Sequence, residues 1–310
     1  MNGIIIIDKP AGFTSHDVVA KLRGILRERR IGHTGTLDPF ATGVMVMLVG
    51  RATRLAQFLS GAEKEYDAAV RLGFATDTGD LTGTPLAPAS NAPLVTQEQI
   101  EEALRPLRGD LMQLPPMYSA KKVQGRKLYE LARRGEEIER APVPVSIRRL
   151  EVVPGPDGQL LRPGHNQDTY DLRISVVCSA GTYVRVLAAE IGRNLGIGAH
   201  LAALRRTRAG AFGLERALTL AGLQSDLEAG RGWEEFFIRP AMALSEMPSV
   251  HLSGQEAQRV RHGMALDMMR PDLVDGAHVR MEEDPGELIA IGVYDRVNQM
   301  VRPRVMLAVN

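Results

Sequence analysis

A single carboxylate, Asp38, stands in a glycine-rich segment, residues 31–50, which reads IGHTGTLDPFATGVMVMLVG. Three glycines within residues 32–43 permit tight turns and close approach of another part of the backbone. Pro39 fixes one backbone dihedral and biases Asp38 towards an extended conformation. The apolar run at residues 44–49 predicts a buried strand behind this loop. The segment therefore presents one acid at a rigid bend, as a catalytic carboxylate requires; an ordinary Asp–Gly turn is the alternative.

Two segments concentrate positive charge that the net charge of +1 conceals. Residues 121–149 carry nine Lys or Arg against four Glu, an excess of five positive charges. Residues 193–208 contain four arginines and no acid. Such local clusters of positive charge favour a polyanionic partner such as nucleic acid. For residues 121–149, the alternative is that the charges simply form a solvated helix face.

Other chemistries are disfavoured by residue usage. One cysteine, Cys178, excludes an internal disulfide and a cysteine-based metal cluster. It ends an apolar strand, where an inert buried thiol is the common case. The seven histidines show no metal-ligand spacing, and no Walker-type lysine follows a glycine loop. We therefore predict no metal site and no nucleotide hydrolysis.

The chain has 310 residues, enough for two domains or one large one, with 44% hydrophobic and 24% charged residues. The start, MNGIIIIDKP, lacks a basic n-region and reads as a strand, not a signal peptide. No apolar run approaches membrane-spanning length. Together with the single cysteine, these features predict a cytoplasmic protein without membrane contact.

The elements that must position Asp38 alternate between strand and helix patterns. Thr14 and Ser15 offer an N-cap for a helix, and Thr96 offers another. The predicted strands span residues 3–8, 44–49, 64–74, 143–153 and 169–178. The predicted helices span residues 16–29, 53–59, 98–107 and 128–134, and a further one ends near residue 195.

The composition shifts near residues 242–249, and the remainder has a short α/β pattern of its own. Ser253 and Gly254 begin a helix over residues 255–261, Gly263 ends it, and several short strands follow. We therefore predict domains at residues 1–243 and 249–310, the second small and β-rich.

The ordered motifs now resemble the TruB family of pseudouridine synthases, which modify the uridine in the T-loop of tRNA. The resemblance covers nearly the whole chain, and the final residues are similar to a PUA domain, an RNA-binding module. The motifs are DKPAGFTS (8–15), GHTGTLDPFATGV (32–44), EY (65–66), TDTGD (76–80), LPPMYSAKKVQGRKLYELAR (114–133), CSAGTYVR (178–185), AHLAALRR (199–206) and IAIGVY (289–294).

The resemblance implies an enzyme that flips a uridine out of the T-loop, cleaves its N1–C1′ bond and rejoins the base through C5, without a cofactor or metal. Asp38 matches the family's catalytic aspartate, Arg185 the arginine that pairs with it, and Tyr66 the aromatic that stacks on the base. Whether Asp38 attacks C1′, adds to C6 or takes a sugar proton stays open. Core packing is the alternative for an isolated tyrosine.

Further roles follow from the same resemblance. Leu204 matches a wall of the base pocket, and His33 the residue that occupies the space left by the flipped base. Lys9 and Pro10 are expected to pack behind the catalytic loop. RNA backbone contacts are expected from basic side chains of an insert at about residues 111–149 and of the second basic segment. These residues are Lys121, Lys122, Arg126, Lys127, Arg205 and Arg206.

The implied fold is α+β: a mixed, largely antiparallel sheet of the pseudouridine synthase type with flanking helices, plus the PUA domain. The implied partner is the T-stem-loop of tRNA, bound by a monomer with no obligatory protein partner. Two rivals remain. A non-catalytic RNA-binding protein would not need Asp38, Tyr66 and Arg185 together, and a guide-RNA-dependent synthase would not need the insert for tRNA contacts.

Overall fold

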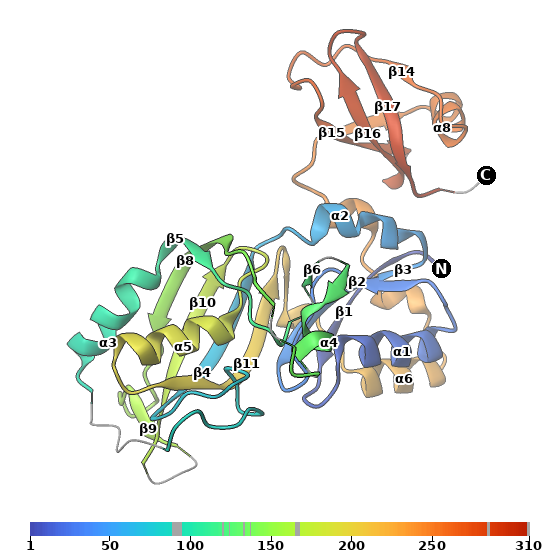
Figure 1. Ribbon diagram of the computed structural model, residues 1–310. Helices are drawn as coiled ribbons and strands as arrows, with labels where there is room; N and C mark the ends of the chain where they lie inside the picture. Colours follow the sequence, from blue (N-terminus) through green and yellow to red (C-terminus); the bar gives the residue numbers. More distant parts are fainter. Residues whose placement is uncertain are drawn as a thin grey trace.

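The computed structural model describes residues 1–88, 95–119, 121–123, 125–132, 134–136, 138–164, 168–283 and 286–308, without the side chains of residues 122, 127, 129 and 130. The chain folds into α+β architecture with a large sheet, flanking helices and a second, smaller sheet near the C-terminus (Figure 1). The predicted fold class is therefore confirmed.

The large sheet contains ten strands, and a two-stranded hairpin lies apart from it. The strands of the large sheet are β1 (Gly3–Lys9), β2 (Ile31–His33), β3 (Thr42–Val49), β4 (Lys64–Leu72), β5 (Gly109–Gln113), β8 (Val143–Val152), β9 (Leu161–Pro163), β10 (Tyr170–Cys178), β11 (Ala199–Ala209) and β12 (Phe212–Gly213). The hairpin is β6 (Lys122–Val123) with β7 (Arg126–Lys127), and the second sheet comprises β13 (Ser249–Leu252), β14 (Leu266–Asp267), β15 (His278–Glu283), β16 (Glu287–Asp295) and β17 (Met300–Met306).

Most helices of the described chain are short. The α-helices are α1 (Ser15–Leu26), α2 (Ala56–Leu59), α3 (Gln97–Leu104), α4 (Leu128–Ala132), α5 (Val184–Asn194), α6 (Leu220–Glu228), α7 (Pro240–Ala243) and α8 (Gly254–Arg261). The 3-10 helices are η1 (Gly50–Leu55), η2 (Arg105–Leu107), η3 (Leu214–Arg216) and η4 (Trp233–Phe236).

Helix α1 shows why the local sequence folds as predicted. The Thr14 side chain caps it by accepting a hydrogen bond from the Asp17 backbone, and the Asp17 carboxylate accepts one from the Thr14 backbone. Val18 and Leu22 are fully buried against the sheet. The helix ends at Arg27, which adopts a left-handed conformation with φ of 52°.

The sheet order is β1-β3-β11-β4-β10-β8-β5, with α3 and α5 over one part of it and α1 and α6 over the other (Figure 1). Along β4 the even-numbered residues, such as Ala68, Val70 and Leu72, are buried against the helices. The odd-numbered residues face solvent and carry charges that pair across strands, such as Arg71 with Asp171 at 2.8 Å. Sheet and helices thus enclose one main core.

The two parts of the sheet meet where β3 runs parallel to β11, at Thr42–Arg205 and Gly43–Arg206. The other pairings in the described part of this sheet are antiparallel. A Cβ atom on Gly43 would lie 2.2 Å from the Arg206 carbonyl oxygen, and Gly43 has a φ of 103°. Only glycine permits this approach, so the glycine-rich segment joins the two parts of the sheet.

The smaller sheet packs against η1 and the segment that connects the two sheets, through a mixed apolar and polar interface. Leu55 at the end of η1 is fully buried against Leu288 and Ile291 of β16. Arg280 of β15 donates hydrogen bonds to the carbonyls of Met247 (2.9 Å) and Ala241 (3.0 Å) in the connecting segment. In Figure 1 this sheet lies beyond α2, away from the helices that cover the large sheet. In the part of the chain that the structure describes, no helix has the length and apolar character needed to cross a membrane.

Candidate active site

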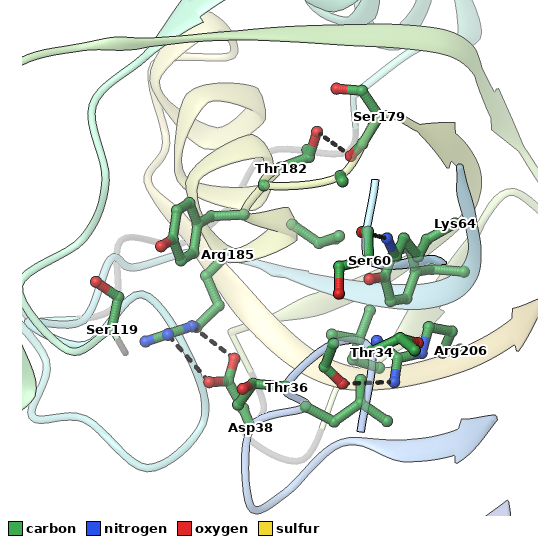
Figure 2. Close-up of a pocket in the computed structure, with 18 residues that line it drawn as sticks. Thr34, Thr36, Asp38, Ser60, Lys64, Ser119, Ser179, Thr182, Arg185 and Arg206 are labelled. Atoms are coloured by element: carbon green, nitrogen blue, oxygen red, sulfur yellow. Dashed lines mark hydrogen bonds and ion pairs between the residues drawn. The ribbon is translucent and has the colours of Figure 1, made fainter. Parts of the chain in front are cut away.

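A cavity of about 320 Å³ opens beside the junction of β3 and β11 (Figure 2). It brings together segments that are distant in the sequence: the loop after β2, the start of β4, the turn before α5 and the middle of β11. The lining residues that matter for the chemistry are Asp38, Lys64, Tyr66, Ser119, Arg185, Leu204 and Arg206.

Asp38 is held by its neighbours in a loop with little freedom. The Ser15 hydroxyl accepts a hydrogen bond from the Leu37 backbone at 2.9 Å, and the Ala41 backbone donates to the Asp38 carbonyl at 3.1 Å. Lys9 is fully buried and donates from Nζ to the carbonyls of Pro39 (3.1 Å), Phe13 (2.6 Å) and Pro10 (2.9 Å). Because Lys9 lies behind the loop and not among the cavity-lining residues, its position fits the expected supporting role. Burial lowers the pKa of Lys9 to about 8.

Arg185, at the start of α5, forms a two-pronged ion pair with Asp38. Nε lies 2.9 Å from Oδ2, and Nη2 lies 3.1 Å from Oδ1. The arginine side chain is 5% exposed, whereas the aspartate keeps 32% exposure because it faces the cavity (Figure 2). Burial raises the pKa of Asp38, and the guanidinium acts in the opposite direction. The pair implied by the family resemblance is therefore present in the structure.

The sequence reasoning missed Asp80 as part of this site. Its Oδ2 lies 3.5 Å from Arg185 Nη1, and its side chain is 6% exposed. Thr82 donates two hydrogen bonds to Asp80 Oδ1, from the backbone at 2.9 Å and from the hydroxyl at 2.6 Å. The guanidinium also donates to the carbonyl of Tyr118 at 2.6 Å. Arg185 is thus held in place by Asp38, Asp80 and the Tyr118 carbonyl. In the sequence, the TDTGD motif that contains Asp80 was the feature that could have indicated this role.

Tyr66 and Leu204 form walls of the cavity from the neighbouring strands β4 and β11. Each is 8% exposed. Burial raises the pKa of the Tyr66 hydroxyl above its ordinary value, so this group is neutral at physiological pH. The geometry therefore places an apolar wall and an aromatic ring in the same cavity as the Asp38–Arg185 pair.

His33 ends β2 and is not among the residues that line this cavity. Its ring packs edge-on against His16 at 6.3 Å, and burial lowers its pKa, so the ring is neutral near pH 7. Its Nδ1 atom is buried and without a hydrogen-bond partner in the described chain. The structure places it before the loop that carries Asp38, outside the residues that line the cavity.

The basic residues expected to contact RNA fall into three groups. Lys121 is half-buried and Arg126 is exposed in the hairpin region. The side chains of Lys122 and Lys127 lie outside the described structure. Arg205 pairs with Asp8 at 2.7 Å.

The expected surface contact is wrong for Arg206. This side chain is 2% exposed and donates to the carbonyls of Val44 (2.6 Å) and Gly35 (3.1 Å) inside the fold. It cannot meet a phosphate on the surface, and it lines the cavity instead. Lys64, which the sequence reasoning also missed, lines the cavity beside it. Within the described ranges, no group of three or more His, Cys, Asp or Glu residues is placed to hold a metal ion.

Comparisons with known proteins identify the family of this chain. A family model described as "TruB family pseudouridylate synthase (N terminal domain)" matches residues 23–184, and "tRNA pseudouridylate synthase B C-terminal domain" matches residues 185–242. A curated relative from Moorella thermoacetica, tRNA pseudouridine synthase B, is 43% identical over 93% of this chain and 92% of its own length. The relative of the same name from Symbiobacterium thermophilum is 47% identical over 86% of this chain and 83% of its own length.

Two solved structures contain chains similar to this one. The chain is similar to one in an H/ACA RNP bound to a substrate RNA containing 2′-deoxyuridine, with a TM-score of 0.70, 26% identity and coverage of 99% of this chain and 85% of that one. A Cbf5-Nop10-Gar1 complex contains another, with a TM-score of 0.69 and 27% identity over 99% of this chain and 84% of that one.

The fold and the relatives define the class of protein, a pseudouridine synthase, which is an RNA-modifying enzyme. More specifically, the chain belongs to the TruB family of pseudouridylate synthases.

Proposed function

We propose that this protein converts the uridine in the T-loop of tRNA to pseudouridine, with Asp38 as its key catalytic residue. The observation that carries the proposal is the two-pronged Asp38–Arg185 pair in a cavity walled by Tyr66 and Leu204. At about 320 Å³ the cavity is at the small end of ligand sites, which span roughly 300–1,000 Å³. A single flipped base with its ribose suits this size better than a folded RNA element.

The reaction begins when the target base leaves its stack, which costs a few kcal/mol. Tyr66 then stacks on the base and Leu204 packs beside it, while the ribose lies towards Asp38. An ionised carboxylate can bond to C1′, add to C6 or take a sugar proton, and Arg185 favours the ionised form in each case. The base turns and rejoins through C5.

The relatives named tRNA pseudouridine synthase B support tRNA as the substrate. Incubation of the purified protein with an unmodified tRNA transcript should convert one T-loop uridine, mapped by chemical labelling and primer extension. A transcript with cytidine at that position is the matched control. Modification elsewhere, or none without an added guide RNA, would contradict the proposal.

Two tyrosine variants test the proposed stacking. Tyr66→Phe should keep the stacking and lose the hydroxyl, so it should bind RNA like the wild type and turn over poorly if the hydroxyl moves a proton. Tyr66→Leu should lose both. Single-turnover rates and RNA dissociation constants measure the two effects separately. Equal, near-wild-type rates for both variants would show that Tyr66 only packs in the core.

We further propose that residues 249–310 form a PUA-type RNA-binding domain and that residues 1–243 carry the reaction. Removal of residues 249–310 should weaken tRNA binding without abolishing chemistry, because the cavity lining lies upstream. The truncation exposes Leu55, so circular dichroism and size-exclusion chromatography must first show a folded, unaggregated protein. A folded truncation with no activity at saturating RNA would contradict this division of roles.

A further inference from the structure

Two cationic side chains of the cavity, Lys64 and Arg206, have no part in the proposed reaction so far. Lys64 is 6% exposed and Arg206 is 2% exposed, so both charges lie inside the protein. In the view of Figure 2 they lie together on one side of the cavity, and the Asp38–Arg185 pair lies on the other. The cavity is therefore positively charged on the side away from the catalytic acid.

The partners of these two side chains are neutral. Lys64 Nζ donates to the carbonyls of Ser60 (2.6 Å) and Ala62, and Arg206 donates to those of Val44 (2.6 Å) and Gly35 (3.1 Å). Neighbouring arginines on β11 differ, because Arg205 and Arg208 each pair with a carboxylate. Within the described ranges, Lys64 and Arg206 form no ion pair.

The two cations also lie next to each other. A Cβ atom placed on Gly35 would be 3.5 Å from Arg206 Nη1 and 3.8 Å from Lys64 Cε. Burial, with a smaller contribution from Arg206, lowers the pKa of Lys64 to about 8. Adjacent buried charges of the same sign are unfavourable unless an anion compensates them. An anion formed in the cavity would remove this cost.

The reaction supplies such an anion. When the N1–C1′ bond breaks, its electron pair stays on the uracil, and the negative charge spreads over the ring nitrogen and the carbonyl oxygens. We propose that Lys64 and Arg206 stabilise the uracil anion released from the ribose. This proposal rests on the proposed pseudouridine synthase activity and adds the residues that bind the leaving group. Fixed charges directed at developing charge are an effective form of catalysis in a site that excludes water.

The step balances on both routes in which Asp38 acts on the sugar and uracil leaves as a free anion. As the electron pair of the N1–C1′ bond leaves with uracil, C1′ gains a new bond in one of two ways. Either an Asp38 oxygen bonds to C1′, or the C2′ proton is lost to Asp38 and a C1′–C2′ double bond forms. The turned base then attacks C1′ through C5, the bond to Asp38 breaks or the proton returns, the C5 proton is lost and N1 gains one. The uracil is anionic only between cleavage of the N1–C1′ bond and formation of the C5–C1′ bond. Lys64 and Arg206 therefore stabilise it during that interval.

Two alternatives to this role of Lys64 must be tested. Lys64 could bind the phosphate of the flipped nucleotide instead of the uracil anion, or it could have a purely structural role. Lys64→Met removes the charge and keeps much of the shape, whereas Lys64→Gln is also neutral but keeps an N–H donor for the Ser60 and Ala62 carbonyls. Arg71→Met is the matched control, because Arg71 lies on the same strand and pairs with Asp171 far from the cavity. Both Lys64 variants should lose about 100- to 1,000-fold in single-turnover rate, the loss typical of removing one such donor. Their RNA affinity should be unchanged, and Arg71→Met should react like the wild type.

The pH profile separates a charge effect from a structural one. The wild-type rate should fall as pH rises through the pKa of Lys64, since only the ammonium form stabilises an anion. Cys178 and Tyr66, which lie near Lys64, do not titrate in this range, because the pKa of Cys178 is raised to about 11 and that of Tyr66 is raised above its usual value. Lys9, behind the catalytic loop, also has a pKa near 8, so loss of the alkaline limb in Lys64→Met is the decisive observation. If the alkaline limb of the pH–rate profile persists in Lys64→Met, the proposed role of Lys64 is wrong.

A tRNA with 5-fluorouridine at the target position identifies the anion. Fluorine withdraws electrons and stabilises the uracil anion by itself, so the cleavage defect of Lys64→Met should shrink by tenfold or more on this substrate. Loss of the original glycosidic linkage is measured after quenching, nuclease digestion and chromatography. Equal defects on both substrates would overturn the proposal. So would weaker RNA binding with an altered salt dependence, which would indicate a phosphate contact.

The outcomes also separate this proposal from the proposed function. A wild-type protein that forms no pseudouridine would contradict the function itself. An active wild type with an equally active, folded Lys64→Met variant would contradict only the role assigned to Lys64.

Discussion

Replacing Asp38 with Asn is expected to leave tRNA binding near the wild-type level and to reduce pseudouridine formation more than a thousandfold. The amide keeps the shape of the side chain, but it is neither a nucleophile nor a charge that can stabilise a cationic sugar. A thousandfold loss corresponds to about 4 kcal/mol of transition-state stabilisation, at about 1.36 kcal/mol for each factor of ten.

The measurement for Asp38→Asn is the single-turnover rate at saturating RNA, with mass spectrometry to exclude deamidation to the wild-type residue. Asp171→Asn is a matched control, because Asp171 pairs with Arg71 on the solvent-facing side of the sheet. The control should retain its activity. Turnover of Asp38→Asn above a thousandth of the wild-type rate would remove Asp38 from the central role.

Arg185→Met is expected to lose turnover severely and to move any remaining activity to higher pH. Burial already raises the pKa of Asp38, and the Arg185 guanidinium opposes that rise. Without it the pKa rises further, because an opposite charge within about 4–6 Å lowers an acid's pKa by about 1–3 units. The ionised carboxylate is the active form, so the acid limb of the pH–rate profile should shift towards neutral pH.

Arg185→Lys should recover only part of the rate, because a point charge cannot reproduce the two hydrogen bonds to the Asp38 carboxylate. Arg185→Met should also melt at a lower temperature, since removing one partner of a buried ion pair costs about 3–5 kcal/mol and Asp80 loses its partner as well. Single-turnover rates across pH and thermal melts measure both effects. If Arg185→Met reacts at the wild-type rate with an unmoved pH profile, Arg185 has only a structural role.

Sequence patterns predicted much of the fold, because hydrophobic periodicity and helix-capping residues are local properties of the chain. The strand at residues 169–178 appears as β10 (Tyr170–Cys178). The helix at 16–29 appears as α1, which begins one residue earlier and ends three residues earlier, because Arg27 ends it with a left-handed turn. The helix at 98–107 divides into α3 and the 3-10 helix η2, where Pro106 cannot supply a backbone donor.

The central strand β11 escaped the sequence reasoning because its alanines, leucines and arginines do not favour a strand on their own. Its pairing with both β3 and β4 imposes the extended conformation. For the same reason its charges were misread as a basic patch. Alternation along the strand separates Arg206, which lines the cavity, from Arg205, which pairs with Asp8. The register of β11 shifts between Arg206 and Arg208, and Arg208 pairs with Glu63, which lies far away in the sequence.

Sequence motifs located part of the candidate site, and only the fold located the rest. Asp38, Tyr66, Leu204 and Arg185 were predicted, and they line one cavity. Asp80 and Lys64 were missed because nothing local distinguishes a turn aspartate or a strand lysine from its exposed counterparts. Their significance depends on burial and on partners contributed by other elements.

The parallel junction of β3 and β11 has a consequence for how the enzyme forms during synthesis. Thr42 and Arg205 meet across 163 positions of sequence, and Asp38 and Arg185 across 147. A ribosome must therefore release most of the large sheet before the cavity can close, and contacts of such long range form slowly. Nascent chains that end before residue 199 lack β11 and leave the loop that carries Asp38 beside an unfinished sheet edge. Activity should consequently appear late and abruptly in a series of stalled chains of increasing length.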